Sequence, residues 1–473
     1  MIKNHLVQQI KENFPYQPTL EQEKVLKSLS DFLFLPQNET VFLLKGYAGT
    51  GKTSLFSALV RTLDQLQQKC VLLAPTGRAA KVFASYAGHP AYTIHKKIYR
   101  QQTVAADMGN FSLSENFSKH TLFIVDEASM ISNQGLTGSA FGSGCLLDDL
   151  INFVYSGEGC RLMLMGDTAQ LPPVGEDLSP ALYADALRGY GLQVFEETLT
   201  QVVRQGQKSG ILWNATVLRQ LIASGDSFAL PKIKITGFAD IQVLPGNELI
   251  AQLEECYQCD GEDETIVVCR SNKRANIYNN GIRSQILWRE SELEGGDRLM
   301  VSKNNYYWLQ NNPQTDFIAN GEMAVVRRVR NERQLYGFRF GDVSLVLPDY
   351  ADMEVEATVL LDTLHSEAPA LTKEENEHLF NEVLEDYADI TQKRERLKKL
   401  KEDAYYNALQ VKYAYAVTCH KAQGGQWKNV FLDQGYMPEE SFTPDYFQWL
   451  YTAFTRATGT LYLVNYPKEQ LIL

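Results

Sequence analysis

The segment KGYAGTGKTSL, from Lys45 to Leu55, combines closely spaced glycines with a lysine and a threonine. It matches the pattern G-x-x-x-x-G-K-[ST], in which glycines let backbone N–H groups approach the phosphates of a nucleotide. The lysine neutralises charge on the β- and γ-phosphates, and the hydroxyl ligates Mg²⁺. The pattern therefore predicts a phosphate-binding loop. The residues expected to contact the nucleotide are Gly46, Ala48, Gly49, Thr50, Gly51, Lys52, Thr53 and Ser54.

Two later segments carry the groups that hydrolysis requires. Asp126 and Glu127 directly follow the apolar run TLFIV, and Gln170 lies in GDTAQLPP. A carboxylate behind such a strand can hold Mg²⁺ while its neighbour orients the attacking water, and an amide can contact both that water and the γ-phosphate. We expect Thr53 and Asp126 to bind Mg²⁺, and Lys52, Glu127 and Gln170 to act in catalysis.

Two arginines complete the predicted catalytic set. Arg204 lies in LTQVVRQ, and Arg456 lies in YTAFTRA near the end of the chain. An arginine that reaches the phosphates across a cleft stabilises charge on the transferred phosphoryl group, an effect of about 10³–10⁵ in rate. The guanine-binding pattern N-K-x-D is not present at Asn272-Lys273, where Arg274-Ala275 follow. We therefore expect ATP as the nucleotide.

The elements that position these residues are short apolar strands, each followed by one of the motifs. Continuous apolar strands that alternate with helical patterns predict βα units around a buried parallel sheet. Ligands bind such sheets at the carboxyl ends of the strands, where these motifs lie. The first set of strands is VFLLK, CVLLAP, TLFIV and RLMLM, and the second set is TIVVC, KYAYAV, VFLDQ and LYLVNY. The fold class is therefore α/β, with two parallel-sheet domains and one phosphate-binding loop.

The stretches MAVVRRV, LYGFRF and DVSLVLPDY have a different character and predict a small antiparallel barrel inserted in the second domain. A charged helical run, roughly Glu374 to Asp403, follows it. For that run a solvated helix is favoured over a contact with nucleic acid. The predicted boundaries are 1–230 for the first domain, with a hairpin inserted at about 99–118, 231–300 and 405–473 for the second domain, and 301–404 for the insertion.

Composition narrows the class of protein. The chain has 473 residues, 44% hydrophobic and 22% charged, with no apolar run near the ~20 residues of a membrane span. Seven scattered cysteines favour reduced thiols and a cytoplasmic location. The net charge of −12 argues against a surface that binds nucleic acid everywhere, although a local basic groove remains compatible with it.

Eight segments occur in the order of the superfamily 1 helicase motifs: GYAGTGKTS, APTGRAA, TIHKKIY, DEASM, GDTAQLPPV, LTQVVRQ, VTCHKAQG and LYTAFTRA. Their wording resembles superfamily 1B, the RecD, Dda and Pif type, over nearly the whole chain. The resemblance implies two RecA-like domains of the P-loop NTPase fold, with an SH3-like accessory barrel in the second. It also implies an ATP- and Mg²⁺-dependent motor that moves 5′ to 3′ on single-stranded DNA, unwinds tailed duplexes, and serves DNA repair or recombination.

The resemblance assigns further residues. It places Gln22 at the adenine, Gly424 and Gln426 at the nucleotide, and Gln423 between the two sites. Phe111 becomes the candidate tip of a wedge hairpin that splits the duplex. The implied DNA contacts are Pro75, Thr76, Arg78, Thr93, His95, Thr418, His420 and Lys421. Gln426 stands in KAQGGQW where many relatives have a glutamate near the ribose, which predicts weaker nucleotide affinity.

Three alternatives remain open from the sequence. A single-strand translocase with little unwinding activity would carry the same motifs, and so would an RNA helicase. A nucleotide-gated interaction protein would need the phosphate loop but not the strand-end motifs. Because both halves of the ATP site lie in one chain, we expect a monomer.

Overall fold

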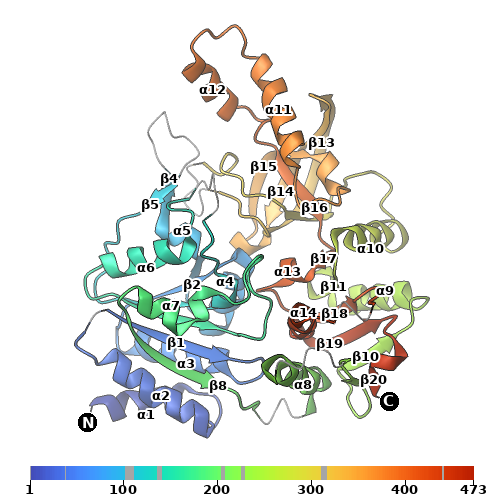
Figure 1. Ribbon diagram of the computed structural model, residues 1–473. Helices are drawn as coiled ribbons and strands as arrows, with labels where there is room; N and C mark the ends of the chain where they lie inside the picture. Colours follow the sequence, from blue (N-terminus) through green and yellow to red (C-terminus); the bar gives the residue numbers. More distant parts are fainter. Residues whose placement is uncertain are drawn as a thin grey trace.

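The computed structural model describes residues 2–37, 39–101, 111–135, 141–203, 208–224, 230–310, 317–438 and 442–472. Two parallel sheets lie side by side, and a closed barrel with a projecting helical arm stands over them (Figure 1). The α/β class, the two parallel-sheet domains and the inserted barrel are thereby confirmed.

The first sheet has the strand order β3-β2-β6-β7-β1-β8, with all pairs parallel. Its central strands are almost wholly buried, which explains their continuous apolar runs. The strands are β1 (Thr40–Gly46), β2 (Cys70–Ala74), β3 (Ala91–Thr93), β6 (Leu122–Val125), β7 (Arg161–Gly166) and β8 (Gln193–Leu199). Each of the four strands predicted for this sheet is present, and each leads into its motif.

Helices surround this sheet, and a short hairpin projects from it. The helices are α1 (Ile2–Asn13), α2 (Leu20–Leu33), α3 (Lys52–Gln65), α4 (Gly77–Ala87), α5 (Ile94–Ile98), α6 (Leu146–Ser156) and α7 (Ala184–Gly189). The hairpin pairs β4 (Tyr99–Gln101) with β5 (Phe111–Leu113), and the residues between them lie outside the described part of the chain.

The second sheet has the order β10-β19-β18-β11-β17, again entirely parallel. Its strands are β10 (Ile241–Leu244), β11 (Thr265–Cys269), β17 (Ala416–Thr418), β18 (Trp427–Asp433) and β19 (Ala457–Val464), beside a small pair, β9 (Ile233–Lys234) and β20 (Leu471–Ile472). Its helices are α9 (Leu249–Asp260), α10 (Asn272–Gln285), α13 (Cys419–Ala422) and α14 (Pro444–Phe454).

The boundary predicted at residue 230 stays a prediction, although the helix just before it packs on the second domain. Helix α8 (Gly210–Ser224) buries Ile211, Ala215 and Leu218 in the same hydrophobic core as α14 of the second domain. The first sheet has already ended at Leu199. The helix was assigned to the first domain because nothing in its own sequence indicates which sheet it covers.

The barrel consists of β12 (Arg298–Val301), β13 (Met323–Leu335), β14 (Phe338–Leu347), β15 (Met353–Leu360) and β16 (Leu409–Tyr413). It extends beyond the predicted insertion of 301–404, since β12 and β16 reach into the stretches 231–300 and 405–473 that were assigned to the second domain. The charged run forms two helices instead of one, α11 (Lys373–Glu385) and α12 (Lys393–Lys401).

Two features of the chain bear on its environment. None of the described helices is long and apolar enough to cross a membrane. All seven cysteines carry free thiols.

Candidate active site

A cleft of about 740 Å³ lies between the two sheets and gathers most of the predicted nucleotide residues. The first domain contributes the phosphate-binding loop with Asp126, Glu127 and Gln170, and the second contributes Gly424, Gln426 and Arg456. These residues come from the carboxyl ends of β1, β6 and β7 and from the segments around β18 and α14.

The phosphate-binding loop has the backbone that its glycines permit. Gly49 and Gly51 have φ angles of +74° and +80°, a region that L side chains rarely adopt. The Lys52 ammonium points into the loop and donates to the carbonyl oxygens of Gly46 and Tyr47, the second at 3.1 Å. Thr53 and Ser54 open α3 and line the cleft.

The side chain of Gln22 contacts the phosphate-binding loop. Its side chain is 1% exposed, its Nε2 donates to the carbonyl of Thr50 at 3.0 Å, and its Oε1 accepts from the N–H of Thr19 at 2.9 Å. A β-carbon on Gly51 would lie 2.6 Å from that Nε2. Gln22 therefore supports the phosphate-binding loop from behind, and its contact with adenine stays a prediction.

The two carboxylates lie together at the end of β6. The N–H of Glu127 donates to Oδ1 of Asp126 at 2.8 Å, and Glu127 has a φ of +53°. Burial, followed by the neighbouring charge of Glu127, raises the pKa of Asp126 to about 7. A cation would offset both the burial of the carboxylate and its repulsion from Glu127, so the site fits Mg²⁺. Thr53 and Asp126 would hold the ion, which supplies charge neutralisation at the phosphates when bound.

Gln170 presents an oxygen without a partner in the cleft. Its side chain is 7% exposed, and its buried Oε1 accepts no hydrogen bond from the described residues. Buried polar atoms are nearly always hydrogen-bonded in folded proteins. This oxygen is therefore suited to accept a hydrogen bond from a water molecule at the phosphates.

Arg456 brings a buried positive charge from the second domain. Its side chain is 2% exposed, and its guanidinium donates to the carbonyls of Thr452 and Gly425 and to the Thr455 hydroxyl, at 3.1, 3.1 and 3.2 Å. Among the described residues no carboxylate lies within ion-pair distance of it. Its charge is therefore available to a phosphate. Arg204, the other predicted arginine, lies outside the described residues.

Helix α14 joins the domains through residues that sequence reasoning missed. The Tyr451 hydroxyl donates to Oδ2 of Asp167 at 2.5 Å and accepts from the N–H of Ala48 at 2.9 Å. The hydroxyl of the next residue, Thr452, accepts from the N–H of Leu171 at 2.8 Å. The only sequence signal was their position in the same motif as Arg456, YTAFTRA.

The KAQGGQW segment reaches the first domain. Gln423 donates from Nε2 to the Leu171 carbonyl at 2.7 Å, next to Gln170, which agrees with the predicted link between the two sites. Gly424 has a φ of +73°, and a β-carbon there would lie 2.9 Å from that of Ala79. Gln426 lines the cleft, and its Oε1 accepts from the Tyr86 hydroxyl at 3.2 Å.

The structure places six of the predicted DNA contacts at the carboxyl ends of strands. Pro75 and Thr76 follow β2, Thr93 ends β3, and Thr418, His420 and Lys421 follow or end β17. The hydroxyls of Thr76 and Thr93 accept from backbone N–H groups of the helices that they cap, both at 3.2 Å. Because each hydroxyl accepts in these bonds, its own O–H can still donate a hydrogen bond to a phosphate oxygen.

Two basic groups on this edge have pKa values that burial lowers. Burial lowers the pKa of Lys421, whose ammonium donates to Oδ1 of Asn320. Burial also lowers the pKa of His420, against a smaller opposing effect of Asp445.

Arg78 is a domain contact in this structure. Its guanidinium stacks over the Trp427 ring at 4.3 Å from the centroid and donates to the Gln426 carbonyl at 3.2 Å. Packing across the domain boundary holds the side chain in this structure, and its contact with DNA stays a prediction. The aromatic partner lies in the KAQGGQW segment, so only the folded chain reveals the pair.

His95 and Phe111 belong to an aromatic cluster, defined here as His95, Tyr99, Phe111, Phe141, Tyr306 and Phe317. Burial lowers the pKa of His95 to about 4, so the imidazole is neutral at pH 7. Phe111 is 4% exposed and stands at the base of the hairpin. This buried position does not support its assignment as the wedge tip, which stays a prediction.

Two family models and several known proteins are similar to this chain. The family model described as an AAA domain matches residues 21–234, and the model described as a UvrD-like helicase C-terminal domain matches residues 413–464. An uncharacterised protein of Acanthamoeba polyphaga mimivirus is 21% identical over 90% of this chain and 96% of its own length. The ATP-dependent RecD2 DNA helicase of Deinococcus radiodurans is 24% identical over 92% of this chain. The chain spans 47% of that helicase.

Solved Pif1 helicase structures are also similar. One, of two coordinating Pif1 helicases at forked double-stranded DNA, is 16% identical, covers 97% of this chain and 95% of its own, and has a TM-score of 0.48. Another, Pif1 from Candida albicans, is 16% identical, covers 96% of each chain and has a TM-score of 0.45. The ordered motifs, the two family models and the RecD2 relative together support an ATP-dependent helicase of superfamily 1B, of the RecD/Pif type.

Proposed function

We propose that this chain is an ATP-dependent motor that moves 5′ to 3′ along single-stranded DNA and unwinds tailed duplexes, acting as a monomer. One observation carries the proposal. The phosphate-binding loop with Asp126 and Glu127 lies in the same cleft as Arg456 from the second domain. A cleft of this kind couples nucleotide state to the distance between two domains, which a motor requires.

The residues have distinct roles in this proposal. The P-loop backbone and Lys52 hold the phosphates, and Glu127 orients the attacking water while the free oxygen of Gln170 accepts a hydrogen bond from it. Arg456 stabilises the negative charge that develops on the transferred phosphoryl group. Arg204 is proposed to add to the same stabilisation.

Movement follows from where the strand-end residues lie. Thr76 and Thr93 belong to the first sheet, and Thr418 belongs to the second. Each sheet would hold the DNA backbone through its own set, because hydroxyl and cationic groups bind phosphates without reading bases. When the cleft opens and closes, the two sets change their separation and the strand advances.

The first experiment measures steady-state ATP hydrolysis without nucleic acid, with a single-stranded DNA oligomer and with the matching RNA. We expect DNA to stimulate hydrolysis strongly in the parent chain and not at all in Lys52→Ala. The thermal unfolding of this variant should match that of the parent chain. Equal stimulation by RNA would favour an RNA helicase. Hydrolysis that neither polymer alters would overturn the motor.

Polarity and unwinding need their own measurement. Duplexes with a 5′ or a 3′ single-stranded tail are compared at saturating ATP, and we expect strand separation only with the 5′ tail. Displacement of streptavidin from a biotinylated single strand reports translocation alone. Displacement without strand separation would identify a translocase that unwinds poorly.

A further inference from the structure

Helix α12 is strongly basic on a chain whose net charge is −12. Its sequence, KRERLKKLK, has six basic residues and one acidic residue, whereas α11 beside it has five glutamates and one lysine. The positive charge is therefore concentrated on one helix. Such a helix attracts anions even when the whole molecule is acidic.

The basic side of α12 is open to solvent. Lys393, Arg394, Lys398 and Lys399 are exposed. Among the described residues their only ion pairs are with Glu402, at 3.9 Å from Lys398 and 3.5 Å from Lys399. Exposed pairs of this kind contribute little, typically below about 1 kcal/mol, so they would not prevent binding of another anion.

The opposite side of the helix fixes its orientation. Leu400 is buried with Leu379 of α11 and with Phe338 and Phe340 of β14. The Arg396 guanidinium donates to the Leu384 carbonyl at 2.6 Å, which ties α12 to the end of α11. We call residues 373–403 the arm, and Figure 1 shows it projecting from the barrel.

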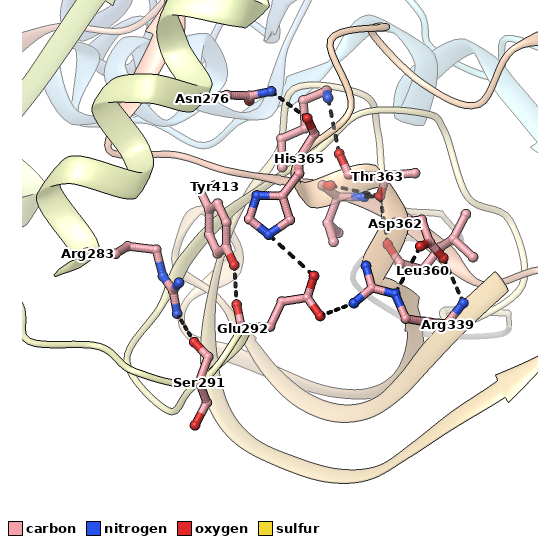
Figure 2. Close-up of polar contacts among 12 residues, drawn as sticks. Asn276, Arg283, Ser291, Glu292, Arg339, Leu360, Asp362, Thr363, His365 and Tyr413 are labelled. Atoms are coloured by element: carbon pink, nitrogen blue, oxygen red, sulfur yellow. Dashed lines mark hydrogen bonds and ion pairs between the residues drawn. The ribbon is translucent and has the colours of Figure 1, made fainter.

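The barrel is in turn attached to the second domain by a polar network around Glu292 (Figure 2). The Glu292 carboxylate accepts from Arg339 of β14 at 2.5 Å and lies 3.3 Å from Nε2 of His365. The His365 carbonyl accepts from Asn276 of α10 at 2.8 Å. The Tyr413 hydroxyl donates to the Glu292 carbonyl. The arm is therefore joined to the second domain through the barrel.

The arm and the β4–β5 hairpin rest on the same segment, residues 304–308. At the base of the arm, the Asn407 carbonyl accepts from Asn305 at 2.7 Å and from Trp308 at 2.9 Å. Between these two residues, Tyr306 packs on Phe111 of the hairpin with the ring centroids 4.8 Å apart. The arm is thus anchored beside the element that the family resemblance associates with strand separation.

We propose that α12 binds the phosphate backbone of the duplex ahead of the point of strand separation. This inference rests on the proposed function, since it needs a fork for the arm to stand over. A nine-residue helix is about 13 Å long, and duplex DNA carries one negative charge per about 1.7 Å of its axis. Several lysines and arginines of α12 can therefore contact phosphates together.

The test replaces Lys393, Arg394, Lys398 and Lys399 together by glutamine. Binding of a duplex with a 5′ tail, of the tail alone and of the blunt duplex is titrated at several salt concentrations. Each phosphate contact contributes about 0.9 to the slope of log K against log salt. We expect that slope to fall by about 2 to 4 for the tailed duplex, and its affinity to fall on the order of tenfold or more at low salt. Affinity for the tail alone should not change.

A matched control removes the same charge elsewhere. Lys3, Lys24, Lys27 and Lys69 are exposed lysines of the first domain, on or near the helices that lie farthest from the arm in Figure 1. Their replacement by glutamine should leave tailed-duplex binding unchanged. Thermal unfolding of both variants confirms that the chain still folds.

Each other outcome overturns the inference. Unchanged binding of the tailed and blunt duplexes would make α12 a solvated helix, and a loss for the tail alone would make it a single-strand contact. An equal loss in the control would show a general charge effect. If ATP hydrolysis of the parent chain ignores single-stranded DNA, the proposed function fails. If that stimulation is present and only the duplex titration is unaffected, the arm inference alone fails.

Discussion

Tyr451→Phe tests whether α14 transmits nucleotide state between the domains. The hydroxyl donates to Asp167 at 2.5 Å and accepts from the N–H of Ala48 at 2.9 Å, so its removal breaks two bonds that cross the domain boundary. Tyr451 and Asp167 are each 1% exposed, so water cannot readily replace the lost partner.

The magnitude follows from the chemistry of the lost bonds. A hydrogen bond to a charged group contributes about 1.5–3 kcal/mol. Since the bonds join the two domains, their loss disfavours the closed cleft. A nucleotide that binds only the closed cleft then loses affinity by the same factor, about 10- to 100-fold.

The assay is a titration with a fluorescent ADP analogue, with thermal unfolding measured in parallel. Tyr446→Phe is the matched control, because Tyr446 lies in the same helix and its hydroxyl donates to Gln434 within the second domain at 2.6 Å. We expect both variants to lose some stability, but only Tyr451→Phe to lose nucleotide affinity. Equal affinity losses, or an unchanged affinity in Tyr451→Phe, would refute the reasoning.

Three further predictions concern separate parts of the chain. Glu127→Gln should lower DNA-stimulated ATP hydrolysis about 10²–10⁴-fold while nucleotide titration shows retained binding, because it removes only a general base; full turnover would contradict that role. Phe111→Ala should lower the free energy of unfolding by about 3–5 kcal/mol in urea titrations, since it leaves a cavity in the aromatic cluster, and an unchanged stability would show that the cluster does not pack as described. Burial raises the pKa of Glu322 to about 8 from 4.5, so its contribution to stability is complete below pH 4.5 and is lost as the pH rises through 8. Relative to the parent chain, Glu322→Gln should therefore gain stability between pH 5 and pH 8, and parallel pH profiles would contradict this.

The sequence predicts the parts of the site that depend on local pattern. Apolar runs identify the strands, and a glycine loop or a carboxylate pair after each run places Lys52, Asp126 and Glu127 at one edge of a sheet. Predicting these residues requires no knowledge of their partners in distant segments. The same holds for Gln170, whose loop follows a neighbouring strand.

The contacts that the sequence did not reveal involve residues whose surroundings are set by packing between distant segments. Gln22 is held by the Thr50 carbonyl and Arg78 by the Trp427 ring, and neither partner is evident from local sequence. Phe111 lies in a segment whose sequence predicts an exposed hairpin, but its ring packs on Tyr306 from the inserted region. A family resemblance predicts which motif position a residue occupies, whereas the contacts of that residue depend on the packing of the individual protein.

The two ends of the barrel lie side by side. Strand β12 pairs antiparallel with β16, with Leu299 opposite Tyr413, and the N–H of Ala414 donates to the Arg298 carbonyl at 2.9 Å. The chain therefore leaves the second sheet and returns to it at nearly the same point. An insertion closed in this way adds a whole barrel without altering the register of the sheet, and its side chains extend the hydrophobic core of the second domain.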